Sequence, residues 1–127
     1  MTRRRKQEAG ALAEAAAREH LEGRGYRVLE TNFRCRSGEI DIVAKHQGQL
    51  VFVEVRSRQG TDFGLPRESV GPRKQRRLSR AAATYLKQNR LGEVSCRFDV
   101  VEVMLDSDGR PREITILRDA FEPRGIF

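Results

Sequence analysis

The sequence predicts an α/β fold, with a mixed central sheet of about five strands flanked by two helices in the order α-βββ-α-ββ. Two observations lead to this prediction. Residues 8–22 and 73–89 have the period of amphipathic helices. Between and after them, short runs rich in Val, Ile and Phe alternate with turn residues, as strands do. A chain of 127 residues has room for one domain, expected over residues 8–127 after a flexible basic tail at residues 1–7.

The first helix is expected from Glu8 to Glu22, because the segment is rich in alanine and is followed by Gly23 and Gly25. One side of this helix holds small or apolar residues together with one acid, namely Gly10, Glu14, Ala17 and Leu21. Glu14 is therefore expected on the inward side of the helix.

Five strands are expected over residues 26–30, 39–44, 50–55, 97–105 and 113–117. A polar turn over residues 32–38 and a break at residues 46–48 separate the first three. Residues 50–55 are almost continuously apolar, which is typical of a central strand covered on both faces. A loop over residues 59–71 then leads to the second helix, whose outward face is strongly basic.

Composition limits the classes of function. The net charge is +7, so a negatively charged partner is favoured wherever Lys and Arg cluster. Cys35 and Cys96 lie far apart with no metal-ligand spacing, so both are expected as reduced thiols. The stretch after the basic N-terminal run carries several charges, which a signal peptide would not tolerate, and no run of 18 apolar residues exists. A cytoplasmic protein without a membrane span is expected.

Acidic residues interrupt two of the apolar strands. Because side chains alternate along a strand, one face of residues 39–44 should hold Glu39, Asp41 and Val43, and the other Ile40 and Ile42. The next strand should place Phe52, Glu54 and Arg56 on one face. A short connection predicts that these two strands are antiparallel neighbours. Asp41 and Glu54 can then point at the same place.

Two neighbouring buried carboxylates raise each other's pKa, and a hard cation such as Mg²⁺ removes that conflict. A bound metal can polarise a phosphoryl oxygen and activate water. Taken singly, each of Glu39, Asp41 and Glu54 is also explained by exposure to solvent or by pairing with an arginine. Taken together with Glu14, they indicate a metal site.

The run Gly38–Ala44 followed by Leu50–Arg58 resembles the signature of the YraN family, a bacterial group related to archaeal Holliday-junction resolvases and to PD-(D/E)xK nucleases. Further matching positions are Gly10 to Glu14, Gly25-Tyr26, Asn32, Lys74, Arg97 to Val101 and Ala120-Phe121. The resemblance covers nearly the whole chain. It implies that the α/β domain is restriction-endonuclease-like.

The resemblance also implies a site for Mg²⁺ or Mn²⁺ formed by Asp41 and Glu54, with Glu14 as a third acid. In the active nucleases, a lysine two residues beyond the strand glutamate positions or deprotonates the attacking water. Arg56 stands at that position here. Arginine stays protonated, so it cannot act as a base, although it can hold a phosphate or stabilise negative charge. Related resolvases act as dimers, so a homodimer is a further expectation.

Basic residues are expected to contact nucleic acid, most of them on the second helix. They are Arg34, Arg36, Arg58, Arg73, Lys74, Arg76, Arg77 and Arg80. A solvated helix face is the alternative explanation for such a run. His20 and His46 are expected on the surface, and Asp99 is expected to pair with Arg97 or to join the site.

Three functions remain open from the sequence. The first is nucleic-acid binding, of DNA in particular, with metal-dependent endonuclease activity on branched or structured DNA carried by Glu14, Asp41, Glu54 and Arg56. The second is a catalytically degenerate nucleic-acid-binding module that has lost the lysine. The third is an adaptor that binds another protein through the basic helix.

Overall fold

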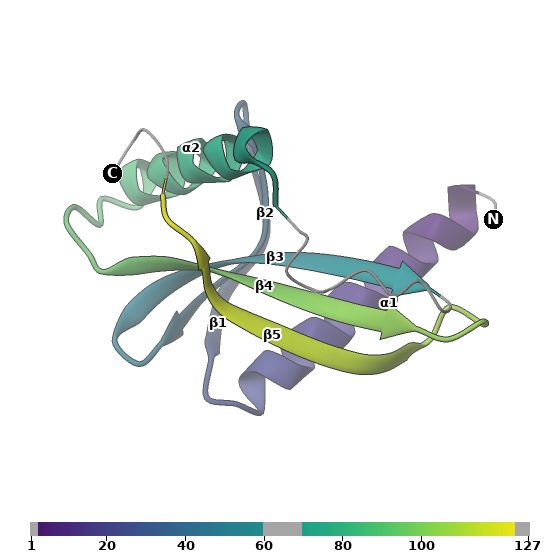
Figure 1. Ribbon diagram of the computed structural model, residues 1–127. Coiled ribbons are helices and arrows are strands. Elements are labelled where there is room, and N and C mark those ends of the chain that lie inside the picture. The colour runs from purple at the N-terminus through teal and green to yellow at the C-terminus, as the bar shows by residue number, and fades with distance from the viewer. Residues whose placement is uncertain (1–2, 60–69, 124–127) are drawn as a thin grey trace.

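The computed structural model describes residues 3–59 and 70–123, with side chains from Gly10 onward. The predicted order α-βββ-α-ββ is confirmed (Figure 1). The elements are α1 (Arg3–Glu22), β1 (Arg27–Cys35), β2 (Gly38–His46), β3 (Gln49–Gln59), α2 (Pro72–Gln88), β4 (Cys96–Leu105) and β5 (Pro111–Phe121). None of the helices in these ranges is long and apolar enough to cross a membrane.

The five strands form one mixed sheet in sequence order, β1-β2-β3-β4-β5. The first three strands pair antiparallel, as predicted for β2 and β3. Strand β4 runs parallel to β3, and β5 returns antiparallel to β4. Because a parallel pair needs a long crossover, the segment that carries α2 connects β3 to β4. Strand β3 is therefore central, as its apolar run indicates.

The two helices cover opposite faces of the sheet. Alternate residues of β3 separate the two cores, since Val51 and Val53 pack with α1 whereas Phe52 packs with α2. The core under α1 includes Ala13, Ala17 and Leu21 from the helix and Ile42, Ala44, Val101 and Val103 from the sheet. The core under α2 includes Leu78, Ala81, Ala82 and Tyr85 from the helix and Phe33, Ile40, Val43 and Phe98 from the sheet.

Element boundaries differ from the sequence expectation at the N-terminal end. Helix α1 begins at Arg3, earlier than the predicted start at Glu8, because Arg, Lys, Gln, Glu and Ala are all good helix formers. Strand β1 continues to Cys35 through the expected polar turn, with a register shift between Val28 and Glu30. Asn32 lies within it at φ 54°, a left-handed conformation that Asn tolerates well. Of the expected loop 59–71, residues 60–69 lie outside the described residues.

The expected face assignment on β2 is wrong for Ile40 and Ile42. Ile40 packs in the core under α2, whereas Ile42 packs in the core under α1. The β1–β2 ribbon bends out of the plane of the sheet, and its tip lies beside α2 in Figure 1. At that tip, Gly38 lies opposite Arg77. A Cβ atom added to the glycine would lie 3.9 Å from the Cβ of Arg77. Simple alternation fails because the ribbon does not stay in the plane of the sheet.

Candidate functional site

Asp41 and Glu54 meet where β2 and β3 separate. The ladder between β2 and β3 ends, on the side away from the turn that joins them, at the pair Ile42 with Val53, so Asp41 and Glu54 are the first residues beyond it. Oδ2 of the Asp41 carboxylate accepts a hydrogen bond of 2.7 Å from the backbone N–H of Val55. A side-chain hydrogen bond joins Asp41 to Glu54. The prediction that both carboxylates point at one place is therefore met.

The position of Asp41 strongly favours a proton. Burial is the main cause, and the hydrogen bond and negative charge of Glu54 add to it, so that the pKa of Asp41 rises from 3.8 to about 8. The hydrogen bond from Val55 acts in the opposite direction, and Glu14 raises the pKa further. At neutral pH the two carboxylates therefore share a proton unless a cation replaces it.

Glu14 approaches the pair from the helix on the other face of the sheet. Its side chain hydrogen-bonds Asn32, and burial followed by the charge of Glu39 raises its pKa. Together with Asp41 and Asn32 it lines a cavity of about 250 Å³ between α1 and the β1–β2 ribbon. Within the described side chains, no three His, Cys, Asp or Glu residues are grouped closely enough to hold a metal ion. Glu14 thus adds negative charge near Asp41 without completing a three-ligand group.

Lys74 completes the surroundings of the pair. Its Nζ lies 2.9 Å from Oε2 of Glu54, whose side chain is only 10 % exposed. A second cavity, of about 350 Å³, is lined by Asp41, Glu54, Lys74 and Arg77 among others, with Gly38, Glu39, Val55 and Leu78 as the remaining lining residues. Three carboxylates and two cations therefore line one cavity, which makes it the strongest candidate for a functional site.

Sequence reasoning assigned Lys74 to the nucleic-acid face and missed its place in the site. One signal was available: Leu78 is an apolar residue that faces inward on α2, and Lys74 lies one turn earlier on the same side of the helix. The lysine therefore stands at the N-terminal end of the inward face. Only the packing of α2 over the β1–β2 ribbon brings that end next to Glu54.

Arg56 and Arg58 follow Glu54 along β3 at alternate positions, so all three side chains lie on the same face of the strand. Arg56 is half-buried and pairs in register with the buried Glu102 of β4. Arg58 forms an ion pair with Glu102, with 3.3 Å between Nε and Oε1. The guanidinium of Arg58 is thus engaged with a buried acid rather than presented to solvent.

The remaining basic residues expected to contact nucleic acid are exposed. On α2 they are Arg73, Arg76, Arg77 and Arg80, and at the tip of the β1–β2 ribbon they are Arg34 and Arg36. Arg34 lies 3.6 Å from Glu39, which lines the cavity of the carboxylate pair. Since Arg77 lines that same cavity, the basic face of α2 is continuous with it.

A buried polar network lies at the other end of the sheet. Arg97 binds both oxygens of Asp99, at 2.9 and 3.1 Å, which confirms their expected pairing. Tyr26 donates to Asp99 at 2.7 Å and stacks on His46. His46 is 4 % exposed, so its expected surface position is wrong. Because a guanidinium can only donate, Nδ1 of His46 accepts a hydrogen bond of 2.7 Å from Arg97, which requires that the nitrogen carry no proton. Burial lowers the pKa of His46.

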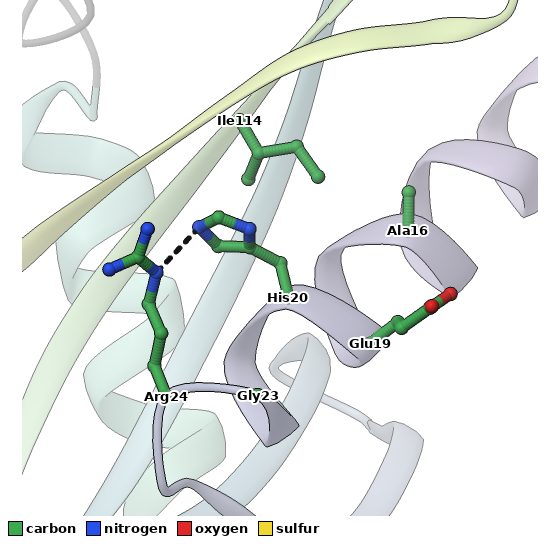
Figure 2. Close-up of a pocket in the computed structure, with 6 residues that line it drawn as sticks. All are labelled: Ala16, Glu19, His20, Gly23, Arg24 and Ile114. Carbon is green, nitrogen blue, oxygen red and sulfur yellow. Dashed lines mark hydrogen bonds between the residues drawn. The ribbon is translucent and has the colours of Figure 1, made fainter.

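A larger hollow lies between the end of α1 and β5 (Figure 2). It has a volume of about 530 Å³ and is lined by Ala16, Glu19, His20, Gly23, Arg24 and Ile114. Arg24 donates to Nε2 of His20 at 2.8 Å, while Glu19 points away from this pair in the figure. Glu19 is the single acid among these lining residues, so no carboxylates converge there, and the smaller cavity at Asp41 is the stronger functional candidate.

The fold and the site define an α/β protein with a carboxylate pair set beside a basic helix. The sequence model of the Uncharacterised protein family UPF0102 matches residues 13–103. The chain therefore belongs to the UPF0102 family, which is the YraN family that its strand motifs resemble.

Individual relatives agree with this assignment. A UPF0102 protein of Moorella thermoacetica is 50 % identical over 121 residues, covering 95 % of this chain and 98 % of its own. A UPF0102 protein of Syntrophus aciditrophicus is 49 % identical over 113 residues, which cover 89 % of this chain and 87 % of the relative. A UPF0102 protein of Acetivibrio thermocellus is 43 % identical over 120 residues, which cover 91 % of this chain and 92 % of the relative.

Proposed function

We propose that the protein binds nucleic acid, DNA in particular, in the cytoplasm and hydrolyses its phosphodiester bonds at the Asp41–Glu54 pair with Mg²⁺ or Mn²⁺. One observation carries the proposal: the half-buried carboxyl group of Asp41 and the buried one of Glu54 interact directly in a cavity that Lys74 and Arg77 also line. Two neighbouring carboxylates oppose each other's ionisation, which costs stability when both are charged. Groups with such perturbed pKa values are found mainly at functional sites.

The donor set fits a hard divalent cation. Mg²⁺ is commonly held by one or two carboxylates, with water and substrate phosphate as its other ligands, and Asp41 and Glu54 supply such a pair. Glu14 would add negative charge from the side of α1. When bound, the metal would polarise a phosphoryl oxygen and lower the pKa of water.

The chain's own residues would bind and orient the substrate. The exposed arginines of α2 would contact the phosphate backbone and supply affinity that depends on salt and not on sequence. Arg77 would hold a phosphate next to the carboxylates, since it lines their cavity. In the hydrolysis, a water oxygen bonds to phosphorus as one P–O ester bond breaks. The water loses a proton to solvent and the leaving oxygen gains one.

A cleavage assay tests the proposal. Linear duplex, single-stranded and four-way-junction DNA would be incubated with the protein and Mg²⁺ or Mn²⁺, beside the variants Asp41→Asn and Glu54→Gln. Glu93→Gln, a change at an exposed acid between α2 and β4, serves as the matched control. We expect cleavage by the wild type and the control and none by the two site variants. Cleavage that survives Asp41→Asn would exclude this site, and a preference for the junction would support a homodimer, because a junction offers two symmetric cuts.

A second candidate is a binding module without catalysis. Arg56 favours it, because arginine cannot take over the proton-accepting role of the lysine that the active nucleases carry at that position. This candidate predicts salt-dependent DNA binding that is equal in the wild type and in Asp41→Asn, with no cleavage by either. A gain of cleavage in Arg56→Lys would also support it.

A further inference from the structure

Helix α2 delivers a lysine to the carboxylate pair from outside the strand that carries Glu54. We propose that Lys74 is the catalytic cation of this site and that its ammonium contacts Glu54 and a non-bridging oxygen of the scissile phosphate. The inference rests on the proposed function. It assigns to Lys74 the role of the motif lysine of the active nucleases, whose position in the sequence is taken here by Arg56.

The geometry of Lys74 suits this role. An ammonium has three N–H donors, so it can hold Oε2 of Glu54 at 2.9 Å and bind a second oxygen at the same time. Its side chain is 55 % exposed, whereas that of Glu54 is 10 % exposed. The lysine therefore spans from solvent, where a substrate arrives, to the buried carboxylate. An ordinary surface ion pair has two exposed partners and contributes little.

The start of α2 holds Lys74 in place. Leu78, one turn further on, is buried in the core under α2. The side chain of Gln75 donates to the backbone oxygen of Val70 at 2.6 Å, and its backbone N–H donates to Gly71 at 2.9 Å. A cation on a packed helix is held more rigidly than one on a loop, and positioned donors are those that stabilise a transition state.

Arg56 is less suited to the same task. It lies on β3 in register with Glu102, a buried acid that also binds Arg58. Among the described residues that line the cavity of the carboxylate pair, Lys74 and Arg77 are present and Arg56 is not. The loss of the motif lysine at position 56 is therefore compensated from the helix.

Four substitutions test the inference, all assayed on the DNA substrate that the wild type cuts best. They are Lys74→Met, Lys74→Arg, Arg56→Met and, as the matched control on the exposed last turn of α2, Lys87→Met. Both kcat and KM would be measured, together with DNA affinity in Ca²⁺. We expect Lys74→Met to lower kcat by about 100-fold, as loss of one transition-state donor does. Its DNA affinity should stay within about threefold, because one phosphate contact among many is lost. Lys74→Arg should recover part of kcat, and Arg56→Met should lose less than Lys74→Met.

A metal titration supplies a readout that does not depend on cleavage. Removal of the ammonium 2.9 Å from Glu54 removes a like-charge repulsion toward a cation, so Lys74→Met should bind Mg²⁺ more tightly than the wild type. The thermal shift with increasing Mg²⁺ measures this affinity, and Lys87→Met should match the wild type.

The outcomes separate the two proposals. No cleavage of any substrate by the wild type overturns the proposed function. Cleavage by Lys74→Met at the rate of Lys87→Met, with Arg56→Met inactive, overturns the assignment of Lys74 alone. Equal Mg²⁺ affinities in the wild type and Lys74→Met would overturn it as well, whether or not the protein cleaves DNA.

Discussion

Asp41→Asn should make the protein more stable while it removes the metal site. The amide keeps the shape of the carboxylate, can accept from the N–H of Val55 and can donate to Glu54, as the protonated acid does. It differs in that it never carries a charge. The substitution therefore removes the electrostatic conflict of the pair and leaves its hydrogen bonds in place.

The magnitude follows from the raised pKa of Asp41, from 3.8 to about 8. Between these values the folded chain binds more protons than the unfolded chain, so stability is greatest at low pH and falls as pH rises through this window. Each unit of pH contributes at most about 1.4 kcal/mol, which gives about 4 kcal/mol at pH 7. Lys74 and solvent in the cavity reduce this figure, so we expect Asp41→Asn to gain about 1–3 kcal/mol at pH 7 to 8.

Urea unfolding in EDTA at pH 5 and pH 8 measures this gain. The free energy of unfolding of Asp41→Asn should exceed that of the wild type at pH 8, with a smaller difference at pH 5. Glu93→Gln, at an exposed acid, should show no such pH-dependent difference. A variant less stable than the wild type at pH 8, or a difference equal at both pH values, would refute the reasoning.

Three further predictions concern the rest of the molecule. Arg76→Ala and Arg80→Ala should each weaken DNA binding and lower the slope of log affinity against log salt by about 0.9, and an unchanged slope would exclude phosphate contacts. Arg97→Met should destabilise the fold by about 3–5 kcal/mol, because it leaves the charge of the buried Asp99 without its cation, and a loss below about 1 kcal/mol in chemical unfolding would contradict this. Burial and Arg97 lower the pKa of His46 in the folded chain, so below pH 6.5 the unfolded chain protonates this histidine more readily than the folded chain does. Stability should therefore fall as the pH drops below 6.5. In His46→Asn that part of the pH dependence should be absent, and an unchanged pH profile would show that His46 does not cause it.

The pairing of Asp41 with Glu54 was predictable because it depends only on local rules. A short connection makes β2 and β3 antiparallel neighbours, which brings Asp41 close to Glu54, and charges inside apolar strands indicate a site. The fold class was predictable for the same reason. Each helix and strand has its own apolar period, and the order of the elements follows directly from the chain.

Other features depend on tertiary packing and were not predictable from periodicity. Ile40 and Ile42 separate into two cores because the β1–β2 ribbon bends out of the plane of the sheet. His46 is buried because Arg97 and Tyr26, both distant in sequence, supply partners for its ring. Lys74 reaches Glu54 only because α2 packs over that ribbon.

Metal-dependent cleavage of DNA by the wild type and by Asp41→Asn, measured side by side, decides whether the carboxylate pair is a nuclease site. Four-way-junction and linear DNA would each be incubated with Mg²⁺, with Mn²⁺ and with EDTA. We predict products with the wild type in either metal, none in EDTA, and none with Asp41→Asn, although that variant is folded and still binds DNA. Cleavage in EDTA, or equal cleavage by both proteins, would contradict the assignment of the site.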